Sequence, residues 1–173
     1  MKEMYNYDLA AQKYYANREF KALPLEAWDL FAERYNKFCK GLEEIQALQH
    51  LAKRQNWSDT SFFEKEILQK DHIVVVTDPQ LHIVHASQNI YQMNGYHPSE
   101  IIGQTPKIFQ GEGTNKATLA KIRTAITEQR SFEATLVNYR KDGSPYKCWI
   151  KGNPVKDTVG RVVNFVAFER EVA

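Results

Sequence analysis

Histidine and cysteine are the residues of this chain best suited to reactive chemistry, and their spacing argues against a reactive site. His72, His82 and His85 lie near the first predicted hairpin. His82 and His85 are three positions apart on a predicted strand, so their side chains point to opposite faces, which is poor geometry for sharing a metal ion. Cys148 would need a nearby base to act as a nucleophile, but its sequence neighbours alternate to the other face of their strand. The sequence therefore predicts no metal site and no catalytic residues, and we expect a protein that is not an enzyme.

The composition excludes several broad classes of protein. Among 173 residues, Lys and Arg number 23 and Asp and Glu number 21. Neither half is strongly basic, so bulk charge does not support nucleic-acid binding. No apolar run approaches the roughly 18 residues of a membrane span, and the start MKEMYNYDLA lacks the apolar core of a secretory signal. Cys39 and Cys148, one in each half, favour reduced thiols. We expect a cytoplasmic protein that binds neither nucleic acid nor membranes.

The first part of the chain is predicted to be helical. A short helix is predicted at 7–17 and a long one at 24–54, where Pro24 suits the first helical position. A shorter helix follows at 60–70. Along the long helix, apolar residues recur in alternating steps of three and four, a heptad rhythm that places them on one stripe. The stripe consists of Trp28, Phe31, Tyr35, Phe38, Leu42 and Ile45.

The periodicity leaves the partner of this stripe open. The helix can lie on its own domain, or it can pair with a second copy of the chain. Burying a large apolar side chain contributes about 1.5–3 kcal/mol, so six such side chains left in water would be an expensive surface. An ideal helix over 24–54 would run roughly 46 Å, longer than a small domain is wide. We therefore expect part of the stripe to meet a second chain, which predicts a homodimer.

The period of the sequence changes near residue 72, where apolar and β-branched runs begin. Strands are predicted at 72–78, 81–87, 132–141, 145–155 and 161–171, and an amphipathic helix at 115–129. Two strands, then helices, then three strands predict an α+β fold, a five-stranded antiparallel sheet with helices on one face. Alternate strand residues should turn toward the helices and line a small pocket. They are Ala134, Leu136, Asn138, Tyr146, Cys148 and Ile150.

The order of these elements and several stretches of the sequence resemble the PAS domain, a sensory fold. The stretch ASQNIYQMNGYHPSEIIGQTP is typical of PAS domains. The stretches GQTPKIFQGEGT, KIRTAI and NYRKDGSPY resemble the light-oxygen-voltage (LOV) subgroup, which binds flavin mononucleotide (FMN). The resemblance covers about residues 68–173. It divides the chain into a helical extension at 1–68, with the dimerisation helix at 24–54, and a PAS domain at 69–173.

The resemblance implies a set of cofactor-binding positions. The phosphate contacts of the subgroup fall on Lys107, Gln110 and Arg123. Two cations and an amide suit a phosphate and its sugar chain, because a guanidinium offers forked donors to oxyanions. The same residues can instead be surface cations and a loop amide, with the glycines of QGEGT permitting positive φ angles between two helices.

At the flavin ring, the resemblance implies one retained contact and several changes. Asn138 keeps the first ring-edge asparagine, Cys148 replaces the second, and Glu169 replaces a glutamine on the last strand. An ionised carboxylate only accepts hydrogen bonds, whereas an amide also donates. Glu169 must therefore be protonated, partnered or turned to solvent. The photoreactive cysteine of the subgroup falls on Pro106, so its usual covalent photochemistry is not available from that position.

Two hypotheses for the function follow. The first is a non-enzymatic sensory or signalling PAS module that acts through protein–protein contacts on an output protein the sequence does not name, with or without a small ligand in its pocket. The alternative is a LOV-like flavin-binding photoreceptor or redox sensor with non-standard photochemistry. Each unpaired ring contact costs about 1–3 kcal/mol, so the changes at Cys148 and Glu169 favour the first hypothesis. Whether FMN is the cofactor is left open by the sequence.

Overall fold

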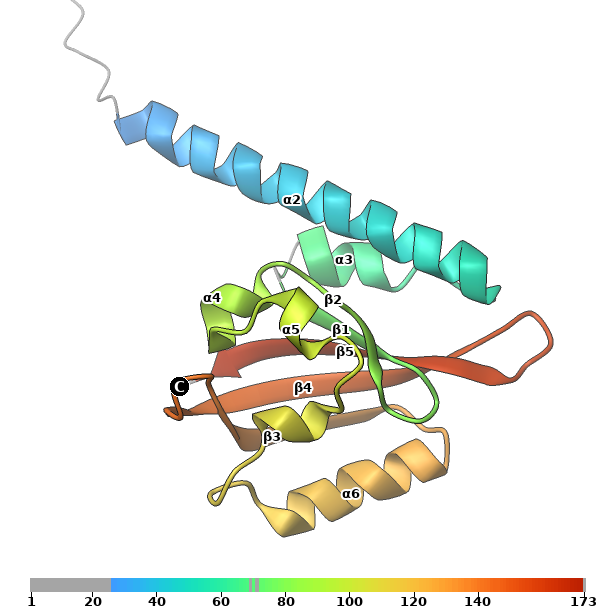
Figure 1. The fold of residues 1–173 in the computed structure, drawn as a ribbon. Helices are drawn as coiled ribbons and strands as arrows, with labels where there is room; N and C mark the ends of the chain where they lie inside the picture. Colours follow the sequence, from blue (N-terminus) through green and yellow to red (C-terminus); the bar gives the residue numbers. More distant parts are fainter. Residues whose placement is uncertain (1–25, 69, 71, 173) are drawn as a thin grey trace, which may run out of the picture. The chain divides into compact units, whose positions relative to one another are not determined.

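The computed structural model describes residues 26–68, 70 and 72–172. Two helices, α2 (Glu26–Gln55) and α3 (Phe63–Leu68), precede the sheet. The strands are β1 (Ile73–Thr77), β2 (Ile83–Ala86), β3 (Phe132–Tyr139), β4 (Pro145–Lys156) and β5 (Val162–Val172). Between β2 and β3 lie α4 (Ile90–Asn94), α5 (Pro98–Ile101), the 3-10 helix η1 (Pro106–Phe109) and α6 (Lys116–Thr127), as Figure 1 shows. The helix predicted at 7–17 lies outside the described residues.

The chain divides into two compact units, Met1–Lys37 and Phe38–Ala173. The boundary falls within α2, so the second half of that helix belongs to the same unit as the sheet. The predicted division between an extension at 1–68 and a domain at 69–173 stays a prediction.

The sheet has five strands in the order β2-β1-β5-β4-β3. Every neighbouring pair is antiparallel, which confirms the predicted sheet, and the strand ends differ from the predicted ones by at most two residues. The β3–β4 turn follows from its sequence. Gly143 has a φ of +83°, and the Asp142 carboxylate accepts hydrogen bonds from the backbone N–H and the hydroxyl of Ser144.

One face of the sheet, here called the inner face, is covered by α4, α5 and η1. A cluster of buried apolar side chains joins these elements to the strands: Ile73, Val75, Ile83, Ala86, Ile90, Met93, Ile101 and Phe109. Tyr146 and Cys148 belong to the same cluster, and Ile150 packs against it. This confirms that these alternate residues of β4 turn toward the helices. In β3, Leu136 pairs with Cys148 and Asn138 with Tyr146, so they share that face.

The opposite face, here called the outer face, is covered by the second half of α2 and by α3. Leu48 and Phe63 are fully buried there, together with strand residues such as Val74 and Val166. The Trp57 indole N–H donates to the Asn164 side chain at 2.8 Å, which ties the end of α2 to β5. The helices predicted for one face are present on the inner face. The second half of α2 and α3 cover the outer face.

The apolar stripe of α2 changes direction along the helix. Ile45, Leu48, Leu51 and Ala52 are buried against the outer face, whereas Tyr35, Phe38 and Leu42 are 60%, 50% and 40% exposed. The predicted stripe ends at Ile45 and omits Leu48 and Leu51, which are buried in the same cluster as residues of the sheet. Of the two alternatives that the periodicity left open, packing of the helix on its own domain holds for residues 45–52, and pairing of the remaining stripe with a second chain stays a prediction. The side chains of Trp28 and Phe31 lie outside the described part of the structure.

A buried carboxylate fixes α3 to the sheet. Glu66, which is 6% exposed, binds His72 Nδ1 at 2.8 Å and the ammonium groups of Lys70 and Lys151 at 3.1 and 3.2 Å. Burial acts to raise the pKa of Glu66, but the bonds from the two lysines outweigh it and hold that pKa below its ordinary value. Burial lowers the pKa of His72. The pair is therefore a carboxylate that accepts from a neutral imidazole.

The loop between η1 and α6 is held against β3. The Thr114 hydroxyl donates to the Val137 carbonyl at 2.7 Å and accepts from the Gly111 N–H at 3.0 Å. The Gly113 N–H donates to the Tyr139 hydroxyl at 2.8 Å. A Cβ on Gly111 would lie 2.5 Å from the Tyr139 ring, so only glycine permits this approach. Asn115 caps α6 by accepting from the Thr118 N–H.

Candidate functional site

Three of the six predicted site residues come together on the inner face. Asn138 of β3, Cys148 of β4 and Glu169 of β5 are 2%, 0% and 5% exposed. Glu169 lies between Ile73 of β1 and Ile150 of β4, its two cross-strand neighbours, and its carboxyl lies 3.7 Å from the Cys148 sulfur. The structure therefore places an amide, a thiol and a carboxyl in one apolar layer.

Two further polar residues complete this group, here called the inner polar cluster: Asn94, Asn138, Tyr146, Cys148 and Glu169. Asn94, at the end of α4, is fully buried, and Tyr146 is 5% exposed. The Asn94 side-chain oxygen accepts from the Tyr96 N–H at 3.1 Å. The Asn94 Nδ2 and the Tyr146 hydroxyl have no hydrogen-bond partner among the described residues. Both amides lie close enough to Tyr146 to affect its pKa, yet the geometry of a hydrogen bond is not met.

Unpartnered donors in a core are costly, so they call for an explanation. A buried polar group left unpaired costs about 1–3 kcal/mol, and native structures contain few of them. Asn94 was missed at the sequence level. The sequence feature that could have identified it is an asparagine directly before a helix-ending glycine. Gly95 ends α4 with a φ of +76°.

The carboxyl of Glu169 is buried without a cationic partner among the described residues. Its one hydrogen-bond partner among the described residues is the Cys148 thiol, a weak donor. Burial raises the pKa of Glu169 to about 7, and the thiol lowers it only in part. A protonated acid donates through its O–H and accepts through its C=O, so near neutral pH the group switches between both roles and acceptance alone.

The other titratable groups of the cluster are neutral. Burial, with smaller contributions from Glu169, raises the pKa of the Cys148 thiol far above its ordinary value. Burial likewise raises the pKa of the Tyr146 hydroxyl. A thiol held in this form is a poor nucleophile, which agrees with the sequence-based expectation for Cys148.

The three predicted phosphate contacts are not buried with the inner polar cluster. Lys107 in η1 and Arg123 in α6 are exposed, and Gln110, directly after η1, is half-buried. The charged groups of Lys107 and Arg123 make no hydrogen bond or ion pair with a described residue. Both cations are therefore available to an anion. Lys107 and Arg123 do not contact each other.

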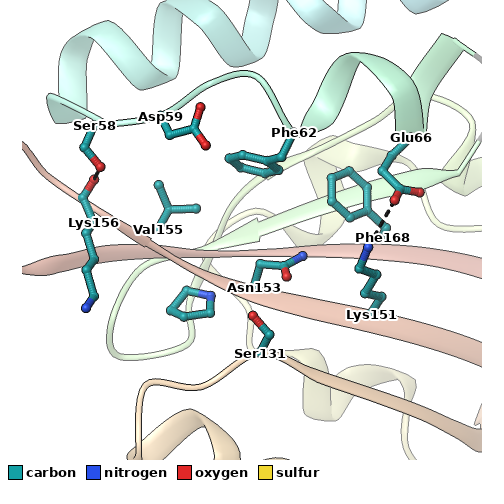
Figure 2. Close-up of a pocket in the computed structure, with 11 residues that line it drawn as sticks. Ser58, Asp59, Phe62, Glu66, Ser131, Lys151, Asn153, Val155, Lys156 and Phe168 are labelled. Carbon is teal, nitrogen blue, oxygen red and sulfur yellow. Dashed lines mark hydrogen bonds and ion pairs between the residues drawn. The ribbon is translucent and has the colours of Figure 1, made fainter.

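Two cavities lie on the outer side of the sheet. The first, of about 350 Å³, lies between the 58–66 segment and strands β4 and β5. Figure 2 shows Phe62 between the two ends of this cavity, with Phe168 and the Glu66–Lys151 ion pair at one end and the Ser58–Lys156 contact at the other. The second, of about 400 Å³, is lined by α2 and β2, including His50 and His85. At the edge of the first cavity, the Glu66 carboxylate is already paired with His72, Lys70 and Lys151.

The histidines do not gather around a metal site. His85 contacts Glu44 of α2, and His82 contacts Asp78 in the preceding turn. In the described part of the chain, no group of three or more His, Cys, Asp or Glu side chains could hold a metal ion. No helix among the described residues has both the length and the apolar character needed to span a membrane.

Comparison with known families identifies the domain that carries these features. The model of a family described as the PAS domain matches residues 70–173, which include the whole sheet and the inner polar cluster. The chain belongs to the PAS domain family. The LOV resemblance of the sequence is confirmed by the relatives of this PAS domain.

Two curated relatives illustrate the likeness. The chain is 43% identical over 111 residues to Protein TWIN LOV 1 of Arabidopsis thaliana, with 61% of this chain and 28% of that protein covered. It is 39% identical over 97 residues to Phototropin-2 of Oryza sativa subsp. japonica, with 56% of this chain and 11% of that protein covered. The match thus spans less than a third of either relative.

Solved structures give the same family. The dark structure of the blue-light photoreceptor Aureochrome1 LOV has a TM-score of 0.60 and 30% identity, with 65% of this chain and 83% of that chain covered. A second LOV structure, of a study on a flavin analogue, has a TM-score of 0.60 and 29% identity, with 64% and 84% covered.

Proposed function

We propose that this protein is a non-enzymatic sensory PAS module that signals by contact with other proteins. The observation that carries the proposal is the change of direction along α2. Its second half is buried against the PAS sheet, while Leu42 and Phe38, about one and two turns before Ile45, are 40% and 50% exposed. A helix that joins the sensory core to an exposed apolar surface is suited to transmit a change in the core to a partner.

The partner proposed for this surface is a second copy of the chain. Two-fold pairing is the commonest way to cover an apolar helical stripe, and the heptad rhythm of the sequence suits helix–helix contact. The output protein beyond the dimer is not named by any feature of the chain. Both cysteines are free thiols, which supports a reducing, cytoplasmic location.

Replacing Phe38 and Leu42 with glutamate should convert a wild-type dimer to a monomer. Both side chains are exposed, so the charges should disrupt the pairing and leave the fold intact. Sedimentation velocity at tens of micromolar measures the change, and circular dichroism checks the fold. Asn36→Glu is the matched control because it is exposed and lies on the opposite side of the helix. A wild-type chain that sediments as a monomer would contradict the proposal.

A second candidate function is flavin binding, which the inner polar cluster favours. We propose Lys107, Gln110 and Arg123 as the phosphate contacts and Asn138, Cys148 and Glu169 as the ring contacts. The donors fit the edge of a flavin ring in part: the Asn94 Nδ2 and the Tyr146 hydroxyl need an acceptor, and ring carbonyls supply one. Glu169 fits only as the acid, because a carboxylate facing ring acceptors would be repelled. The test is whether the protein binds riboflavin below neutral pH.

A further inference from the structure

The cavity between α2 and β2 has a polar lining and lies on the other side of the sheet from the inner polar cluster. It measures about 400 Å³, within the usual range of small-molecule sites in proteins. Three of the residues that line it carry side-chain nitrogen groups: His50 and Arg54 of α2 and His85 of β2. Its apolar part is formed by Ala47, Leu51 and Val84. Among the described residues that line this cavity, none is acidic.

The two polar side chains of α2 are free to bind a ligand. His50 and Arg54 are four positions apart within the helix, so they lie one turn apart on the same side of it. Both residues are exposed, and neither the imidazole nor the guanidinium makes a hydrogen bond or an ion pair with a described residue. An arginine presents a fixed fork of N–H donors, which matches the oxygens of a carboxylate or a phosphate.

The imidazole of β2 is held in place by a carboxylate. Glu44 of α2 contacts the Nε2 atom of His85, and the two side chains are 12% and 21% exposed. This contact sets the orientation of the His85 ring. It also pairs the Glu44 carboxylate, which would otherwise oppose an anion beside His85. The second ring nitrogen, Nδ1, has no hydrogen-bond partner among the described residues.

We propose that this cavity binds a small organic anion, whose carboxylate or phosphate contacts Arg54 and the two imidazoles and whose apolar body lies on Leu51 and Val84. An inorganic anion alone would leave most of the cavity to water, since one water molecule takes up roughly 30 Å³. It would also gain nothing from the apolar residues. The ligand contacts both α2 and β2, the edge strand of the sheet, so its binding favours the packing of α2 on the domain.

Calorimetric titration with benzoate, phenyl phosphate and benzamide tests the proposal. The three probes share an aromatic body, and benzamide carries no charge. We expect at least one of the two anions to bind at one site per chain, and benzamide to bind about tenfold more weakly or less, because a hydrogen bond to a charged group contributes more than a neutral one. The anion that binds more tightly identifies the preferred head group. Equal binding of benzamide and both anions would overturn the proposal.

Replacing Arg54 with glutamine should lower the affinity for the preferred anion about tenfold or more, because the charged fork is lost. Lys53→Gln is the matched control. It removes the same charge from the neighbouring position of α2, and Lys53 is exposed and does not line the cavity. This control should bind the anion as the wild type does. Equal losses in the two variants would show a response to the net charge of the helix end and would overturn the site.

The NMR signals of the histidine rings locate the bound probe. His50 and His85 line this cavity, whereas His72 binds Glu66 at the edge of the first cavity and His97 precedes α5. We expect the rings of His50 and His85 to shift as the anion is added, and those of His72 and His97 to stay unchanged. Shifts at His72 alone would place the probe in the first cavity. That result, or no saturable binding of either anion at millimolar concentration, would overturn the proposal.

Discussion

Replacing Glu169 with glutamine should raise the free energy of unfolding by about 3 kcal/mol at pH 8 and by no more than a few tenths of a kcal/mol near pH 4.5. The buried carboxyl has a pKa of about 7 in the folded protein, against 4.5 as its ordinary value. As the pH rises from 4.5 to 7, the unfolded chain loses this proton and the folded one keeps it. Ionisation therefore favours the unfolded state, and stability falls over this range and stays low above it.

Urea denaturation of both proteins at the two pH values measures this difference. Glutamine has no charge to lose, so the variant should lack this pH dependence. Glu112→Gln, at an exposed loop position, is the control and should behave as the wild type at both pH values. Equal stability of the wild type and Glu169→Gln at pH 8 would mean that the carboxyl is not held in an uncompensated apolar site.

Replacing Leu48 with alanine should cost about 2–5 kcal/mol of stability, because the side chain is fully buried between α2 and the sheet. Leu42→Ala is the matched control: the same substitution in the same helix, at a side chain that is 40% exposed. Its cost should be within about 1 kcal/mol. Chemical denaturation at low protein concentration measures both, so that any dimerisation contributes little. Similar losses for the two variants would show that the second half of α2 is not part of the domain core.

The strands could be predicted because their signals are local. IVVVT is a continuous β-branched run, and its residues are buried on both faces of the sheet. Asp142 and Gly143 mark the β3–β4 turn by residue type alone. Alternation within β4 then indicated that Tyr146 and Cys148 share a face, and the helices on that face confirm it.

The contacts of α2 could not be predicted, since its partner is far away in the sequence. A heptad rhythm describes a stripe without naming what covers it. Leu48 and Leu51 are buried by strand residues such as Val166, more than a hundred positions later. The change from an exposed Leu42 to a buried Ile45 depends on these distant contacts, which no local pattern encodes.

The strand residues of the candidate site could be predicted from the sequence. Their hydrogen bonding could not. The family resemblance pointed to Asn138, Cys148 and Glu169, and the register of the sheet explains why they share a face. The lack of a partner for the Asn94 Nδ2 depends on how α4 packs against strands that lie far from it in the sequence. The phosphate contacts proposed at Lys107, Gln110 and Arg123 stay predictions.

We propose that the inner polar cluster is where this PAS domain takes a ligand, and the side-chain amide signals of Asn94 and Asn138 test this most directly. Two-dimensional NMR of labelled protein at pH 6, with and without riboflavin, resolves these groups from Asn153, which lines the cavity of the outer face. We predict that the Asn94 and Asn138 amides shift on binding and that Asn153 does not. Shifts at Asn153 with Asn94 and Asn138 unchanged would contradict the account and place the ligand on the outer face.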